Sequence, residues 1–254
     1  MPDLNRKPPT AVRRALRREV GFGCPVEGCG IPYLEYHHFD PEWHVEKHHR
    51  PDGMIALCST HHAKADAWTV EQCRELKQNP HTAEVSGRFE WMRREVVAIV
   101  GGNYYHETPK MVVFRDQPII WFERDERGYL LLSIRMLSTS GQPRTNLIAN
   151  DWEILGEPIE VDSPPNGSFL QVKYTNGDEV GIRFKKWESA EKLREIHPRI
   201  LVLGDQITFP LVTAEVNLAV GGTDIRFSSK KSDLGGMQMQ GNVMSRCGVG
   251  LAFG

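Results

Sequence analysis

The chain has 254 residues, of which 40% are hydrophobic and 25% charged, the balance of a folded protein with an apolar core. This composition excludes a mostly disordered or fibrous chain, and no apolar stretch approaches the roughly 20 residues that span a bilayer. The net charge of −2 excludes nucleic-acid binding through overall charge, and the length allows one or two domains of ~150 residues. Because the start lacks the apolar segment of a secretory signal, we expect a cytoplasmic protein with no membrane partner.

A short basic helix is predicted over residues 11–20, after Pro8-Pro9 and with Thr10 as its N-cap. Residues 1–24 carry six basic side chains against two acidic ones, a local charge of +4. Four arginines at i,i+4 spacing should occupy the exposed side, where they would contact DNA phosphates or form an ordinary solvated surface. These arginines are Arg13, Arg14, Arg17 and Arg18.

Residues 24–58 are rich in Cys, Pro, Gly and His and too poor in aliphatic residues to build a core alone. Helices are predicted from Ser59 to Ala67 and over Thr69–Gln78, where Thr69 and Gln72 form a capping box. Apolar residues at helical spacing predict a further helix over residues 87–100. Gly101-Gly102 then breaks the pattern, which places a domain boundary near residue 100.

The chain beyond residue 105 shows the period-two alternation of β-strands. Hairpins are predicted around Asn176-Gly177 and between Ile119–Glu123 and Tyr129–Arg135, and a further strand over residues 212–220. One helix is expected over residues 188–196. The fold class is therefore α+β, with a small domain over residues 1–100 and a mainly antiparallel β domain over residues 101–254.

Seven of the ten histidines lie between His37 and His62, and three of the five cysteines bracket this segment. Two short pairs, C-x4-C and C-x2-H, lie about 30 residues apart and supply the four ligands of a structural zinc site. Buried free cysteines and a surface histidine are the alternative. The predicted zinc ligands are Cys24, Cys29, Cys58 and His61.

The same part of the sequence also contains a second set of candidate metal ligands. His62 and Asp66 are four residues apart on a predicted helix, so both project from one face, and His37 completes a set that leaves positions open for water and substrate. Strand alternation turns His38 away from the side that His37 faces. A histidine that lies next to a metal without binding it is suited to act as a general base.

Residues 11–80 resemble the HNH endonuclease family, also called ββα-metal or His-Me finger nucleases. The resemblance rests on Leu34-Glu-Tyr-His37-His38-Phe39 and Leu57-Cys58-Ser-Thr-His61-His62. It implies that His37 binds the catalytic metal and His38 activates water, that His61 replaces a family cysteine, and that His62 is the family's final histidine. Asp66 falls where some members, including colicin-type DNases, carry a further ligand.

One position departs from the family pattern. The family's middle asparagine would fall at Gly53, and Asp52, His48 or His49 is expected to take its role. His44, His48 and His49 each have the alternative of being solvated loop residues. The β domain carries no comparable motif, and Cys247 is expected to be just a small hydrophobe.

We therefore expect a zinc-stabilised, metal-dependent HNH endonuclease that hydrolyses DNA phosphodiester bonds with one divalent ion, Mg²⁺ or Mn²⁺. The β domain is expected to regulate, to bind a protein partner or to form a homo-oligomer. Family habits suggest restriction, phage biology or anti-phage defence. Two alternatives stay open: a zinc-dependent DNA-binding module without catalysis, and a regulatory or structural protein whose β domain is the functional part.

Overall fold

The computed structural model describes residues 4–81 and 84–254 and divides into two units. Unit 1 comprises Met1–Gly87 and Ile159–Gly167, and unit 2 comprises Arg88–Pro158 and Ser168–Gly254. Unit 1 thus takes in a second segment that the predicted division near residue 100 does not include. Residues 1–3, at the start that lacks the apolar segment of a secretory signal, lie outside the described residues. Within the described ranges, no helix has the length and apolar character needed to cross a membrane.

Unit 1 contains a two-stranded antiparallel sheet followed at once by a helix. Strand β1 (Leu34–His38) pairs with β2 (Met54–Cys58), and α2 (Ser59–Lys64) begins directly after β2. The 3-10 turn η2 (Ala65–Ala67) continues α2, so the helix predicted over residues 59–67 is observed with a tighter last turn. Unit 1 also contains α1 (Thr10–Glu19), η1 (Pro51–Gly53) and α3 (Val70–Gln78).

The predicted N-terminus is confirmed for α3 but not for α1. Helix α3 has the expected capping box, in which Thr69 accepts from the Gln72 amide and the Gln72 side chain accepts from the Thr69 amide. The predicted N-cap of α1 is wrong by one residue, because Pro9 occupies that position and Thr10 is already helical. The fixed φ of proline supplies the extended entry to the helix without a capping side chain.

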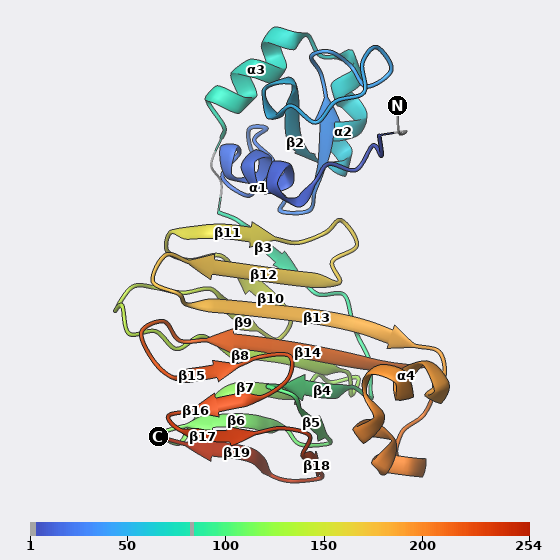
Figure 1. The fold of residues 1–254 in the computed structure, drawn as a ribbon, viewed down its shortest axis with the longest axis vertical. Helices are drawn as coiled ribbons and strands as arrows, with labels where there is room; N and C mark the ends of the chain where they lie inside the picture. Colours follow the sequence, from blue (N-terminus) through green and yellow to red (C-terminus); the bar gives the residue numbers. More distant parts are fainter. Residues whose placement is uncertain (1–3, 82–83) are drawn as a thin grey trace. The chain divides into compact units, whose positions relative to one another are not determined.

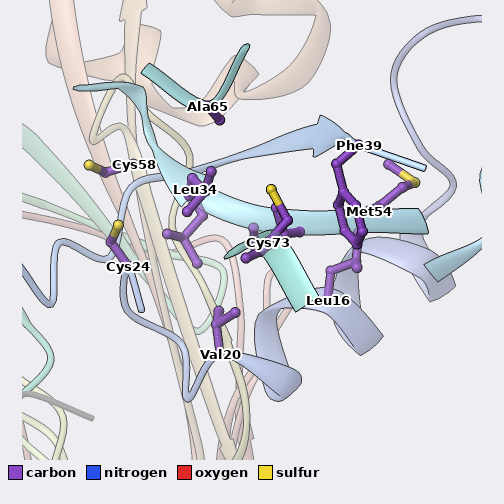
Figure 2. Close-up of a cluster of buried hydrophobic side chains, with 12 residues drawn as sticks. Leu16, Val20, Cys24, Leu34, Phe39, Met54, Cys58, Ala65 and Cys73 are labelled. Atoms are coloured by element: carbon purple, nitrogen blue, oxygen red, sulfur yellow. The ribbon is translucent and has the colours of Figure 1, made fainter. Parts of the chain in front are cut away.

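The core of unit 1 lies between the β1–β2 sheet and the helices around it. Leu16 of α1 and Cys73 of α3 pack with the fully buried strand β2, and all three elements contribute to one apolar cluster. Figure 2 shows Cys24 and Cys58 at one end of this cluster, with Phe39 and Met54 at the other. The cysteines therefore close one end of a small core.

The helix predicted over residues 87–100 is wrong. The segment instead contributes to β3 (Ser86–Arg88) and forms β4 (Val97–Val100), in which every side chain is buried. β4 pairs with a neighbouring strand along each edge, and the burial of all its side chains shows that both of its faces are covered. The run Val96-Val-Ala-Ile-Val100 is rich in β-branched residues, which favour a strand buried on both faces over a helix.

Both hairpins predicted for the second half are present. β12 (Phe169–Tyr174) and β13 (Glu179–Trp187) pair across Asn176-Gly177, where Gly177 has a φ of 91°. β7 (Gln117–Arg124) and β8 (Leu130–Arg135) form the other hairpin. The predicted long strand and helix are observed as β14 (Leu211–Ala219) and α4 (Ala190–Ile196), with η3 (Pro198–Gln206) between them.

Unit 2 is built on two sheets, one that contains β7 and β8 and one that contains β12, β13 and β14, all labelled in Figure 1. Its further strands are β5 (Asn103–His106), β6 (Lys110–Phe114), β9 (Asn146–Ile148), β10 (Asp151–Glu153), β15 (Ile225–Phe227), β16 (Ser232–Leu234), β17 (Met237–Met239), β18 (Val243–Ser245) and β19 (Val249–Phe253). β11 (Pro158–Asp162), like β3, crosses the division between the units.

The two sheets are mixed rather than purely antiparallel. One follows the order β19-β6-β7-β8-β9-β10, and the other contains β12-β13-β14-β15-β16-β17 with β4, β5 and β18 attached. The pairs β14–β4, β18–β5 and β19–β6 are parallel. Phe227 of β15 lies 6.2 Å from Phe253 of β19 between ring centroids, so the sheets contact each other through apolar side chains. The protein is α+β, with mostly antiparallel strands in mixed sheets.

Candidate metal centre

The four residues predicted to bind zinc converge on one point of unit 1. Their ligand atoms all lie within 4.8 Å of one another. The sulfurs of Cys24 and Cys58 are each 3.3 Å from Nδ1 of His61, and the sulfur of Cys29 is 3.8 Å from that of Cys58. Zn–S bonds of about 2.3 Å and Zn–N bonds of about 2.0 Å give a tetrahedron with edges of about 3.5–3.8 Å. This Cys3His cluster could therefore hold a metal ion such as zinc.

Two local backbone features place these side chains. The amide of Cys29 donates to the Val26 carbonyl at 3.0 Å, and this turn brings Cys29 back beside Cys24. Cys58 is the last residue of β2 and His61 lies in the first turn of α2. Because Cys58 ends a strand and His61 lies in the first turn of the following helix, both side chains point toward the turn that carries Cys24 and Cys29.

The charges at this cluster also favour a cation. Burial raises the pKa of the Cys24 thiol to about 12, and repulsion from Cys58 and Cys29 adds to the effect. Burial, with a smaller contribution from Lys64, lowers the pKa of His61 and so favours its neutral, metal-binding form. Three thiolates this close are stable only around a positive ion, which deprotonates the thiols it binds.

His37 and His62 face each other beside the Cys3His cluster. Their ring centroids are 5.5 Å apart at an interplanar angle of 88°, and Nδ1 of His37 lies 3.8 Å from a carboxylate oxygen of Asp66. His37 is buried, whereas the Asp66 side chain is 87% exposed. Asp66 lies in the 3-10 turn η2 rather than on α2 itself. Among the described residues, only the Cys3His cluster has three or more ligand atoms within 4.8 Å, so these three residues converge more loosely.

Glu35 is a neighbour of this second group that the sequence reasoning missed. One of its carboxylate oxygens lies 3.7 Å from Nδ1 of His62, and the other accepts a hydrogen bond from Ser59. Glu35 and His37 are two residues apart on β1, so they share a face. The strand alternation that separates His37 from His38 could also have indicated that Glu35 lies on the same face as His37.

His38 has a different set of neighbours, as strand alternation predicts. Its Nε2 donates to the His48 carbonyl at 3.0 Å, which leaves Nδ1 with a lone pair. Nδ1 is buried and has no hydrogen-bond partner within the described residues. The ring packs against Trp43, with centroids 4.8 Å apart. Burial lowers the pKa of His38 to about 4, so the imidazole is neutral at pH 7.

Gly53, where an asparagine would be expected from the resemblance, has no room for a side chain. A Cβ on Gly53 would lie 1.9 Å from the Asp40 carbonyl oxygen, so no asparagine fits there. Of the residues expected to take the asparagine's role, the buried His48 ties the loop. Its Nε2 donates to the Pro41 carbonyl at 2.9 Å, and its Nδ1 accepts from the Arg50 amide at 3.1 Å. The exposed His44 instead pairs with Glu42.

The arginines of α1 differ in their surroundings. Arg13 donates to Thr10, and Arg18 donates to the Ile159 carbonyl at 2.9 Å. Arg14 and Arg17 form ion pairs with the same second segment of unit 1. The helix therefore presents fewer unpaired cations than its sequence suggests.

Comparison of the chain with models of protein families, with curated proteins and with solved structures found no match.

Proposed function

We propose that unit 1 is a metal-dependent endonuclease that hydrolyses phosphodiester bonds of DNA. The observation that carries the proposal is the facing pair His37 and His62, flanked by the carboxylates of Asp66 and Glu35. These residues come from β1 and the segment just after β2, beside a Cys3His cluster. This order of strands, helix and histidines supports the resemblance to HNH endonucleases.

The donor set suits a divalent ion such as Mg²⁺ or Mn²⁺. It would be bound by the imidazoles of His37 and His62 and by the exposed carboxylate of Asp66. These three ligands leave coordination positions of the ion open to solvent. Burial and the nearby His62 lower the pKa of His37, which keeps its ring available as a neutral ligand. When bound, such an ion stabilises the negative charge that develops on a phosphate during hydrolysis.

His38 is assigned the role of general base. The His48 carbonyl fixes the proton on Nε2, so Nδ1 is the atom that accepts a proton from water. Because Nδ1 is buried against the loop that carries Trp43 and His48, this role requires that loop to move when DNA binds. The Cys3His cluster holds the fold around the site and takes no part in the reaction.

Unit 2 is proposed to regulate the nuclease, to bind a protein partner or to form a homo-oligomer. This assignment rests on its size, since its two sheets carry no part of the histidine group. If the chain is instead a regulatory or structural protein, unit 2 is the part that would carry that function.

One observation favours the second candidate function, a zinc-dependent DNA-binding module without catalysis. The base assigned to the reaction is 4% exposed, and its pKa of about 4 makes it a weak proton acceptor. A binding module has no need of an accessible base. In that case the Cys3His cluster and the basic helix would carry the function.

Cleavage of supercoiled plasmid by the full chain separates these functions. We expect nicking with Mg²⁺ or Mn²⁺ and none with EDTA. The matched variants are His62→Ala, which removes a proposed ligand, and His44→Ala, which removes an exposed histidine outside the group. Activity that His62→Ala abolishes and His44→Ala retains supports the nuclease. DNA binding without cleavage under every metal condition supports the binding module.

A further inference from the structure

Unit 2 contains a cavity of about 720 Å³ that is separate from the histidine group of unit 1. It lies where the end of α4 meets strands β4, β5 and β14 and the loops after β15 and β17. Cavities of ~300–1,000 Å³ are the usual size for small-molecule sites. The size therefore suits a metabolite rather than a single ion.

The floor of the cavity is one row of side chains across three strands. Glu215 of β14 is in register with Ile99 of β4, and Ile99 is opposite Tyr104 of β5. Residues in register on adjacent strands project from the same face of a sheet. Asn217, two residues after Glu215, projects from the same face of β14 and also lines the cavity. The floor thus combines an apolar centre with polar groups at its β14 side.

A histidine at the end of α4 covers this floor. Nε2 of His197 lies 3.2 Å from a carboxylate oxygen of Glu215, and the ring packs edge-on against Tyr104 and Trp187. The hydrogen bond from His197 lowers the pKa of Glu215, and Arg183 and Lys185 on β13 add to the effect. Glu215 is therefore ionised at neutral pH, but it is surrounded by more positive than negative charge.

Two further cations line the cavity without a carboxylate partner. Arg199 of η3 and Lys230 of the loop after β15 are both exposed, and within the described chain neither has a carboxylate oxygen within 4.0 Å. Arg199 lies beside Gly241, which also lines the cavity. Basic side chains with no acidic partner at a cavity are available to bind an anion.

We propose that this cavity binds a small organic phosphate, with the phosphate held by Arg199 and Lys230 and the organic part against Ile99 and Tyr104. Guanidinium and ammonium groups donate charge-assisted hydrogen bonds to phosphate oxygens. The apolar part of the floor gives a site that distinguishes an organic phosphate from inorganic phosphate. The proposal does not depend on nuclease activity.

Calorimetric titration of the full chain with AMP, glucose 6-phosphate and phenyl phosphate tests the proposal. We expect at least one of these probes to bind, and its affinity to fall by about tenfold or more in the double variant Arg199→Gln/Lys230→Gln. The control is Lys192→Gln/Arg194→Gln on α4, which makes the same change of charge outside the cavity and should leave the affinity unchanged. Melting temperature shows that both variants fold.

Three results would overturn the proposal. The first is no binding of any probe at millimolar concentration. The second is equal affinity in the wild type, the cavity variant and the control. The third is inorganic phosphate binding as tightly as the organic probes, which would reduce the cavity to an unselective anion site. A short duplex DNA that loses affinity in the cavity variant, while no probe binds, would assign these cations to nucleic acid instead.

Discussion

Arg17 of α1 and Asp162 form an ion pair inside unit 1, with 3.1 Å between Nη1 and Oδ1. The Arg17 side chain is 3% exposed and also donates to the Tyr36 hydroxyl at 2.7 Å. One turn earlier, Nε of Arg14 lies 2.6 Å from an oxygen of Glu160. The basic helix is thus joined to a segment from the second half of the sequence, and the two arginines have different roles.

We expect Arg17→Ala to destabilise unit 1 by about 3 kcal/mol, because it leaves Asp162 and Tyr36 without their partner. Arg13→Ala on the same helix should cost less than about 0.5 kcal/mol, since among the described residues Arg13 bonds only the nearby Thr10. Urea unfolding followed by hydrogen exchange in β1 and β2 measures both. A loss of less than about 0.5 kcal/mol in Arg17→Ala as well would show that the Arg17 contacts contribute nothing to the stability of unit 1.

Glu160→Gln is expected to increase DNA affinity. The change releases Arg14, whose side chain is 49% exposed, and one more available cation should steepen the salt dependence by about one unit of slope. Glu157→Gln removes a nearby exposed carboxylate that has no arginine partner among residues 4–81 and 84–254, and serves as the control. The measurement is fluorescence anisotropy with a labelled duplex over a range of salt. An unchanged slope in Glu160→Gln would exclude Arg14 from the DNA contacts.

Local signals predicted local structure well. Asn176-Gly177 specified a hairpin because both residues tolerate the backbone of a tight turn, and Thr69 with Gln72 specified where α3 begins. The spacing within the C-x4-C and C-x2-H pairs suits the binding of one ion, and the predicted cluster of all four residues is observed. These features depend on a few residues that are near one another in the sequence.

Features that depend on distant contacts were missed. The apolar spacing over residues 87–100 is compatible with a helix, and only pairing on both sides of β4 decides for a strand. Nothing in the sequence indicates that Ile159–Gly167 belongs to unit 1 or that Asp162 would meet Arg17. The cavity of unit 2 was missed for the same reason, because Tyr104, His197 and Lys230 come from three distant segments.

The Cys3His cluster predicts that purified protein contains one tightly bound zinc. Cys24→Ser should lose this zinc and unfold unit 1, because metal binding contributes on the order of 10 kcal/mol in small zinc domains. Cys247→Ser changes a half-buried cysteine in unit 2 and should keep both zinc and melting temperature. Elemental analysis and circular dichroism measure the two effects. Protein without zinc, or a Cys24→Ser variant that melts normally, would contradict the assignment.

Asp178 predicts a pH-dependent stability in unit 2. Burial alone would raise the pKa of this carboxyl, but hydrogen bonds from Ser138, Arg144, Asn176 and the Gly221 amide outweigh it and lower the pKa below 3.8. A lowered pKa stabilises the folded state above the unfolded value of 3.8, and this stability is lost as the pH falls through the folded value.

We therefore expect Asp178→Asn to cost about 3 kcal/mol at pH 7, since Arg144 loses a buried partner, and the difference from wild type to shrink below about pH 4. Urea unfolding of unit 2 at several pH values measures this. Asp224→Asn, an exposed control in the same unit, should show no such dependence. A constant difference between Asp178→Asn and wild type at every pH would contradict the assigned pKa.

The rate of plasmid nicking as a function of Mg²⁺ or Mn²⁺ concentration, compared among His37→Ala, His38→Ala and His44→Ala, tests the nuclease proposal most directly. We expect His37→Ala to require much more metal, and His38→Ala to bind metal and DNA normally while cleaving about 10²–10⁴-fold more slowly. His44→Ala should cleave as the wild type does. Wild-type protein that binds DNA and zinc but nicks nothing, or full activity in both His37→Ala and His38→Ala, would contradict the account.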